Sequence, residues 1–161
     1  MNAEQNGTLM RGVVVAIVTD VDDPSRMARV RLHYPSLGND IASGWVPVAT
    51  LLAGRDRGAW FMPEVDDEVL VAFDNGHFGT PYVVGRLWNG KDLPPETETT
   101  NRVIKTPGGH ELRFEDKPGS KKIVVKTDGG LQITMDDTKQ SIEIKGGGRA
   151  ITMQAGQLKI T

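Results

Sequence analysis

The chain contains 161 residues, which is enough for one compact domain or for a small domain with an extension. Its formal net charge is −2, and its 38% hydrophobic and 25% charged residues are typical of a folded globular protein, which excludes wholesale disorder. The absence of cysteine excludes disulfide bonds and thiolate metal sites. No apolar run approaches the roughly 18 residues of a membrane-spanning helix. The N-terminus lacks the apolar core of a secretory signal peptide, so we expect any export to use another route.

The charge is distributed unevenly along the chain. Residues 1–100 carry 8 Lys or Arg and 14 Asp or Glu, whereas residues 101–161 carry 11 and 7. Six of the nine aromatic residues lie between residues 57 and 90, within the acidic part. Because nucleic-acid binding needs basic side chains for the phosphates, this distribution argues against a stacking platform for single-stranded nucleic acid.

Residues 8–92 are expected to form a small barrel. Short β-branched or alternating runs at residues 11–21, 27–35, 43–53, 68–75 and 80–90 end at Gly, Pro, Asn or Asp, which indicates strands joined by turns. An excursion at residues 51–61 separates the third strand from the fourth. Five strands without room for crossover helices predict an antiparallel barrel of the OB type. The side chains expected in its core are Val30, Leu32, Trp45, Val69, Val71, Phe73, Tyr82 and Val84.

The pattern changes after this barrel. Residues 93–102 are polar, include a Pro-Pro pair and are expected to be an extended linker. In residues 103–161, apolar residues come in pairs spaced two apart, with mostly polar partners between them and polar turns after them. Every second strand recurs after 19 or 20 residues, which indicates a weak repeat of two short strands. The paired apolar residues are Leu112, Phe114, Ile123, Val125, Leu131, Ile133, Ile142, Ile144, Ile151, Met153, Leu158 and Ile160.

Such short strands cannot bury their apolar face alone. A flat meander would leave that face and both sheet edges exposed to water. Three identical chains wound about a threefold axis would cover the faces and pair the edges between chains. We therefore expect an all-β protein in which residues 103–161 form a triple-stranded β-helix within an intertwined homotrimer, with the paired apolar residues facing the axis.

Three segments carry a resemblance to a known family: GWVPVAT at residues 44–50, RGAWFMPEVDDEVLVAFDNGHFGTPYVVGRLWNGKDLPP at residues 57–95, and NRVIKTPGGHELRFED at residues 101–116. Their order and spacing resemble the spike of contractile injection machines. These spikes include the phage baseplate assembly protein V family, the VgrG-type spikes of type VI secretion and the spikes of extracellular injection particles. The resemblance covers nearly the whole chain and implies an OB barrel followed by a β-helical needle.

The sequence departs from that family at several points. Asp66 stands where the family often has Gly, so either the turn is altered or a left-handed φ is met by another residue type. The family's Gly-Asp after the Phe strand is Gly76-His77 here. VgrG-type spikes carry a hub module before the barrel, whereas this chain begins at the barrel, which implies a separate trimeric hub protein. The metal-binding H-x-H motif of some spike tips is absent from this sequence. A separate tip protein of PAAR type or a truncated chain would both explain that absence.

No catalytic, cofactor-binding or metal-binding residue is expected. His33, His77 and His110 are isolated from one another, although a threefold axis could gather three copies of His110. The acidic cluster at residues 64–68 lacks the spacing of a calcium loop, and the Gly-rich turns near residues 128 and 147 precede no helix that would bind phosphate. The aromatic residues of the acidic part are instead expected in the barrel core or at contacts between subunits. They are Trp45, Trp60, Phe61, Phe73, Phe78, Tyr82 and Trp88.

The expected function is therefore structural. The resemblance implies a spike that caps the inner tube of an injection machine and pierces the target cell envelope when the sheath contracts. It also implies assembly in the cytoplasm into a virion or tail-like particle. Two alternatives stay open from other classes: an OB-fold module that binds single-stranded nucleic acid or oligosaccharide, and a cell-wall hydrolase like relatives with a lysozyme insert. The first leaves residues 103–161 unexplained, and the second needs a far longer linker.

Overall fold

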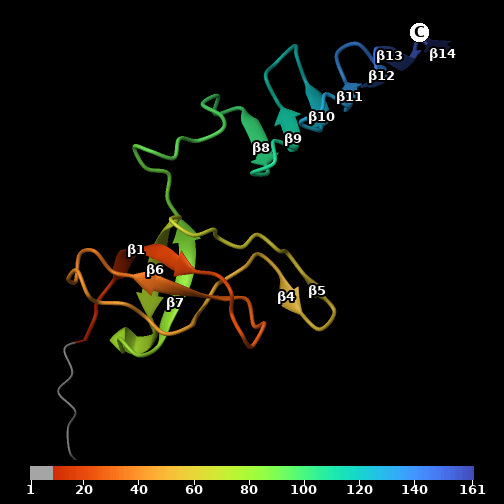
Figure 1. The fold of residues 1–161 in the computed structure, drawn as a ribbon. Coiled ribbons are helices and arrows are strands. Elements are labelled where there is room, and N and C mark those ends of the chain that lie inside the picture. The colour runs from red at the N-terminus through yellow and green to blue at the C-terminus, as the bar shows by residue number, and fades with distance from the viewer. Residues whose placement is uncertain (1–8) are drawn as a thin grey trace, which may run out of the picture. The chain divides into compact units, whose positions relative to one another are not determined.

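The computed structural model describes residues 9–161, and the chain divides into two units, Met1–Leu93 and Pro94–Thr161. Strands β1 to β7 belong to the first unit and strands β8 to β14 to the second (Figure 1). Within residues 9–161 the one helical element is a short 3-10 turn, η1 (Asp74–Gly76), and no helix there is long and apolar enough to cross a membrane. The predicted all-β class is confirmed.

The first unit is a five-stranded sheet that curls into a nearly closed barrel. Its strands are β1 (Val13–Asp20), β2 (Arg29–His33), β3 (Val46–Pro47), β6 (Glu68–Phe73) and β7 (Pro81–Arg86), in the order β3-β2-β1-β6-β7. A parallel bridge between Val48 and Val83 joins the two edge strands, and the amide of Ala49 donates to the carbonyl of Val83 at 2.8 Å. This connectivity is the OB topology, so the predicted barrel is confirmed.

Alternate residues of these strands form the barrel core. Strand β6 shows the alternation most clearly, because every second residue points inward and is buried. The predicted core residues that are buried are Val30, Leu32, Val69, Val71 and Phe73. The core also contains Ala16, Val18, Tyr34, Val46 and Val83, which the sequence did not single out.

The predictions for Tyr82, Val84 and Trp45 were wrong. Tyr82 and Val84 are 43% and 48% exposed, while Val83 between them is buried. The register with β6 sets the inward side: Val83 lies opposite the buried Val71, whereas Tyr82 lies opposite Ala72 on the outer face. A β-bulge then makes Val84 an extra residue between the Val71–Val83 and Leu70–Gly85 pairs. Trp45 is half-buried outside the core cluster, and the Arg31 guanidinium stacks 4.9 Å from its ring centre.

The aromatic side chains of the first unit separate into two groups. Phe78 packs against Phe73 and against the buried Tyr34, with ring centres 5.4 and 5.6 Å apart, so this cluster extends the core. Three other aromatic residues that we expected either in the core or at subunit contacts are more than half exposed, which excludes the core for them. They are Trp60, Phe61 and Trp88.

Asp66 occupies a backbone conformation that favours glycine. Its φ is +75°, and its amide donates to the carbonyl of Val18 at 2.9 Å, which ties the turn before β6 to β1. The left-handed requirement is therefore kept, and an aspartate meets it in place of glycine. Aspartate tolerates this region better than most residues do.

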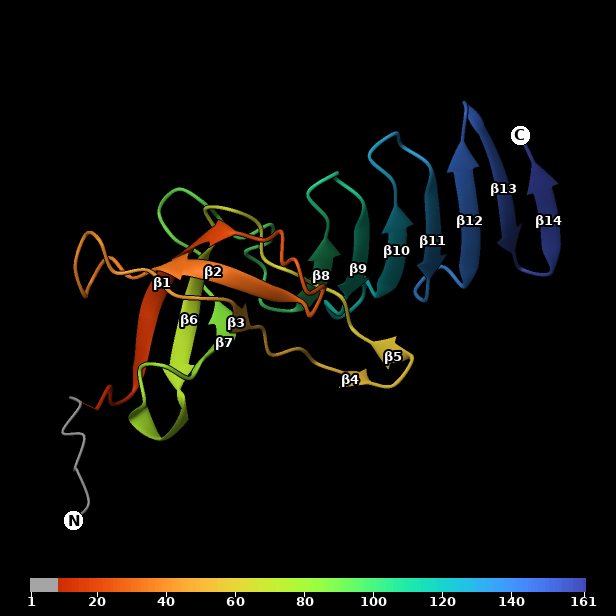
Figure 2. The same cartoon turned by 60° about the horizontal axis from the view of Figure 1, so that its bottom comes forward.

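The second unit is an antiparallel meander of seven strands, each paired with its neighbours in sequence (Figure 2). The strands are β8 (Asn101–Lys105), β9 (Glu111–Glu115), β10 (Lys122–Lys126), β11 (Gln132–Asp136), β12 (Ser141–Gly146), β13 (Arg149–Gln154) and β14 (Gln157–Ile160). The last two hairpins have two-residue turns with positive φ at both positions, at residues 147–148 and 155–156. Such turns match the twist of paired strands.

The turns after β8 and β10 repeat one design. In each turn a threonine amide donates to a carbonyl four residues later at 2.9 Å, from Thr106 to His110 and from Thr127 to Leu131. The third residue after each threonine is a glycine, Gly109 or Gly130, with φ of +83° or +84°. The two turns recur after 21 residues, whereas the sequence predicted a two-strand repeat of 19 or 20.

The segment before β8 is held in place by Glu96. Its carboxylate accepts hydrogen bonds from the amides of Thr97 and Glu98 at 2.7 and 2.9 Å and from the Asn101 side chain at 2.9 Å. The Arg113 guanidinium pairs with the same carboxylate. The amide of Glu98, followed by these other donors, lowers the pKa of Glu96 to about 2. Part of the predicted linker is therefore fixed against β9, and β8 itself begins at residue 101, inside the range expected as linker.

Candidate trimer interface

One face of the β8–β14 sheet carries two continuous rows of apolar side chains. Residues directly opposite each other in antiparallel strands lie on the same face, so the pairing register defines each row. The first row is Ile104, Leu112, Val125, Ile133, Ile144, Ile151 and Ile160. The second row is Phe114, Ile123, Met135, Ile142, Met153 and Leu158. Together the rows form what we call the apolar face.

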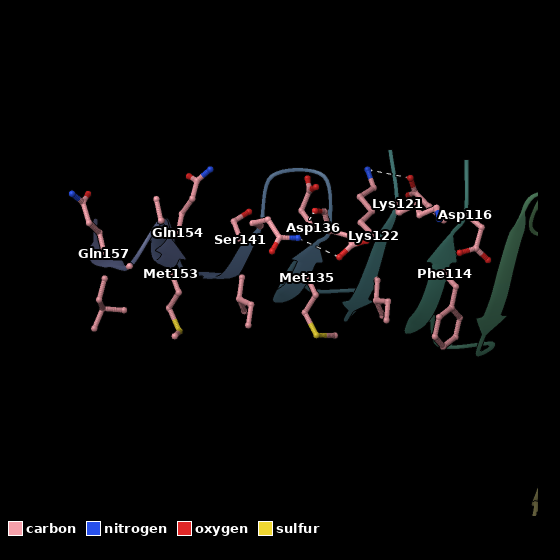
Figure 3. A pocket seen from close by; sticks show the side chains of 18 residues that line it. Phe114, Asp116, Lys121, Lys122, Met135, Asp136, Ser141, Met153, Gln154 and Gln157 are labelled. Carbon is pink, nitrogen blue, oxygen red and sulfur yellow. Dashed lines mark hydrogen bonds and ion pairs between the residues drawn. The ribbon is translucent and has the colours of Figure 1, made fainter. Parts of the chain in front are cut away.

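The opposite face of the same strands is polar. Figure 3 shows Phe114, Met135 and Met153 extending to one side of the strands, while Lys122 and Gln154 extend to the other. Ion pairs run across this polar face, including Lys122 with Glu115 at 3.1 Å and Lys145 with Glu143 at 2.9 Å. The two faces therefore differ sharply in chemistry although they are the two sides of one layer.

The apolar face is more exposed to water than the polar face, which is the reverse of what a stable monomer would show. Among the apolar residues, exposure ranges from 37% at Phe114 to 71% at Ile160, with only Leu112 and Ile123 less exposed. On the polar face the side chains of Arg113, Glu115 and Glu143 keep less than a third of their surface exposed. Their ion pairs and long aliphatic stems cover that side. Extended apolar surface of this kind marks an interface.

Eleven of the twelve residues that the sequence predicted as inward-facing belong to the apolar face, and their burial against other chains stays a prediction. Leu131 precedes β11 rather than lying within it. Its Cδ2 would stand 2.6 Å from a Cβ on Gly146, so a glycine there leaves room for the leucine. Sequence reasoning missed Ile104 and Met135, although Met135 continues the alternation that Ile133 begins.

His110 and the acidic cluster at residues 64–68, which the sequence offered as candidate chemical sites, form hydrogen bonds that stabilise turns. The ring nitrogen Nδ1 of His110 accepts a hydrogen bond from the amide of Asp128 at 3.3 Å, which joins the turn after β8 to the turn after β10. In the acidic cluster, the Asp67 carboxylate accepts from the amide of Glu64 at 2.9 Å. Across residues 9–161 no group of three or more His, Cys, Asp or Glu side chains is placed to hold a metal ion.

Both units match known protein families. Residues 14–88 match the type VI secretion system/phage-baseplate injector OB domain, and residues 101–161 match the phage baseplate V C-terminal trimerisation domain. The second match falls on the strands that carry the apolar face. It supports self-assembly through that face.

Individual relatives of the chain include spike proteins of type VI secretion systems. The chain is 36% identical over 107 residues to the actin cross-linking toxin VgrG1 of Vibrio cholerae, which is 59% of this chain and 10% of the relative. It is 35% identical over 109 residues to the type VI secretion system spike protein VgrG3 of Vibrio cholerae, covering 60% and 11%. With VgrG1b of Pseudomonas aeruginosa it shares 25% identity over 124 residues, covering 68% and 17%. The chain thus spans less than a fifth of the length of these relatives. With both domains matched in the order that its fold shows, the chain belongs to the baseplate V and VgrG spike family of phage and type VI secretion injection systems.

Proposed function

We propose that three copies of this chain form the central spike of a contractile injection machine, which caps the inner tube and pierces the target envelope. One observation carries this proposal: the apolar face is more exposed in the single chain than the polar face behind it. Three such sheets around a threefold axis would place the apolar rows inside and the ion-paired faces in water. The match to a trimerisation domain supports the same arrangement.

The energetics favour an obligate trimer. The two rows supply thirteen partly exposed apolar side chains in each chain. Burying the remaining half of such a side chain contributes about 1 kcal/mol, so each chain gains on the order of 10 kcal/mol. Association costs roughly 4–15 kcal/mol for each chain that joins, and three chains gain about 30 kcal/mol against two such costs. The gain and the cost are therefore comparable at worst.

The mechanical role follows from this construction. A spike must transmit force along its axis without bending, and a continuous close-packed core between three sheets, each hydrogen-bonded within its own chain, resists bending. No bond is made or broken in the target by this action. The machine, whether a phage tail, a phage-like bacteriocin or an extracellular particle, would assemble in the cytoplasm and release the spike with the particle.

The proposal includes two further partners. A trimeric hub protein would join the barrels to the inner tube, because a threefold spike fits a threefold base without symmetry mismatch. A tip protein of PAAR type would cover the C-terminal end of the needle.

A particle assembled with a variant spike tests the function. Ile142→Asp would place three charges at the axis, and we expect particles that lack a spike and do not admit dye into target cells. Gln132→Asp is the matched control, because it adds the same charge on the polar face between Lys126 and Lys145. Particles with Ile142→Asp that assemble and permeabilise targets as well as the control would contradict the proposal.

A further inference from the structure

The barrel carries an exposed hairpin with apolar residues at its root. We call residues 51–61 the arm; it contains β4 (Ala53–Gly54) and β5 (Arg57–Gly58) and projects from the barrel (Figures 1 and 2). Leu51 is 92% exposed and Trp60 is 75% exposed. The Thr50 hydroxyl donates to the carbonyl of Ala59 at 2.5 Å, and the amide of Ala59 donates to the carbonyl of Leu52 at 2.8 Å. The root is therefore bonded in a defined conformation, and the exposure is not a result of fraying.

A second apolar surface lies on the outside of the barrel sheet. Val13 on β1 and Tyr82 on β7 both pair with Ala72 of β6, and Val15 pairs with Leu70. Val13, Val15, Tyr82 and Val84 are exposed, and Leu70 and Ala72 between them are half-buried. We call these six residues the outer belt. The outward face of a barrel strand in water normally alternates to polar residues, so a belt of this composition indicates a contact surface.

A groove joins the belt to the root of the arm. It has a volume of about 470 Å³, and its lining includes Leu51 and Phe61 from the arm and Val84 and Arg86 from β7. Each barrel therefore presents a concave apolar groove and, on the arm, a protruding tryptophan. Tryptophan is among the residues that contribute most to interfaces when it enters such a groove.

We propose that the arm of each chain packs on the outer belt of the next chain, with Trp60 in the groove, so that the three barrels form a closed ring. This inference rests on the proposed trimer and goes beyond the needle interface. A ring of three identical chains needs two different surfaces on each chain, because its contacts are head-to-tail, and the arm and the belt are two such surfaces. The net charges are opposite in sign: residues 1–93 outside the arm carry 6 basic and 11 acidic side chains, whereas the arm carries Arg55 and Arg57 beside Asp56. A basic arm is thereby attracted to an acidic neighbour.

Thiol labelling tests whether both surfaces are buried in the trimer. The chain has no cysteine, so Leu52→Cys on the arm and Val84→Cys on the belt each provide a single thiol and leave Trp60 in place. Asp22→Cys, on an exposed turn, is the control. We expect at least tenfold slower labelling at residues 52 and 84 than at residue 22, and faster labelling at residue 84 when Trp60→Ser is added. Equal rates at all three positions in a trimer of confirmed mass would overturn the inference.

Co-assembly identifies the occupant. Trimers containing both Leu52→Cys chains and Val84→Cys chains should yield covalent dimers with a short thiol-reactive crosslinker, whereas trimers of either variant alone should not. A mixed trimer without such dimers would overturn the inference, as would slow labelling that appears only after a hub protein is added. A single-chain mass in light scattering would instead refute the proposed function, so the two failures are distinguishable.

Discussion

Replacing Ile133 with aspartate is the sharpest perturbation of the proposed needle core. Ile133 lies in the middle of the first apolar row, opposite Val125 on β10 and Ile144 on β12. It is 41% exposed in the single chain, and trimer assembly would bury this remaining surface. Any charge introduced there would meet its two copies close to the axis.

The expected magnitude follows from this exposure. Burying a whole isoleucine side chain contributes about 1.5–3 kcal/mol, so the remaining share is about 1 kcal/mol per chain and about 3 kcal/mol per trimer. Ile133→Ala should therefore weaken assembly by roughly a hundredfold, since about 1.4 kcal/mol corresponds to a factor of ten. An unpaired buried carboxylate adds several kcal/mol per chain, which brings the cost of Ile133→Asp to on the order of 10 kcal/mol per trimer or more. We expect no trimer at micromolar concentration.

Sedimentation velocity of the purified variants measures this effect, with circular dichroism to follow heat resistance. Gln132→Asp is the control, because it adds the same charge one residue away, on the face where Lys126 and Lys145 lie opposite. The control should sediment as wild type. Heat-resistant Ile133→Asp trimers would show that the apolar rows do not face the axis, and the reasoning about the interface would be wrong.

Three further predictions concern single residues. Asp66→Val should lower the free energy of barrel unfolding, measured in urea, by roughly 1–2 kcal/mol, because a β-branched residue resists the left-handed conformation. Asp66→Gly should not lower it. A valine variant as stable as wild type would disprove this prediction. The pKa of Glu96 is lowered from 4.5 to about 2, so its stabilising contribution is complete above pH 4.5 and is lost as the pH falls toward 2. Glu96→Gln should flatten that acid loss in urea titrations, and an unchanged slope would refute the assignment. Gly109→Ala should destabilise the needle in thermal unfolding, since φ is +83° and its Cβ would meet the Asp128 carboxylate at 2.6 Å. Gly129→Ala, with open space around it, should be near neutral, and equal effects would contradict the argument.

Much of the fold follows from the alternation of apolar residues. In β6 the pattern from Glu68 to Phe73 predicts both the strand and its inward face, because all residues of one parity are buried. The same holds for Val30 and Leu32 in β2. In the second unit, the i, i+2 pairs predict the shared face of the strands, since each strand is paired in register with the next.

The errors have physical causes that a pattern cannot reveal. The inward side of β7 is set by its register with β6, where Val83 lies opposite Val71, and the apolar run Tyr82-Val83-Val84 does not reveal which parity faces inward. Trp45 is half-buried under the Arg31 guanidinium outside the core cluster, so its size did not predict a place in the core. The hydrogen bonds of Glu96 arise from partners as distant as Arg113, which places them beyond sequence reasoning.

Most residues of the candidate interface, in contrast, could be predicted from the sequence. Its residues were predictable because apolar residues recur at every second position of each strand and so share one face. Val103 and Val124 are exceptions, since they lie beside Arg113 on the polar face. Met135 was missed because the pair Leu131/Ile133 already satisfied the expected spacing, and the structure shifts the strand two residues onward. The arm and the outer belt were not predictable as surfaces, because exposure of a tryptophan depends on which strands close the barrel.

The native mass of the wild-type protein tests the central claim most directly. One chain has a mass of 17.5 kDa, and native mass spectrometry at successive dilutions measures how many chains stay together. The account predicts a single species of three chains that persists on dilution, because the apolar faces have no other cover. A species of one chain, unchanged by dilution, would contradict the account.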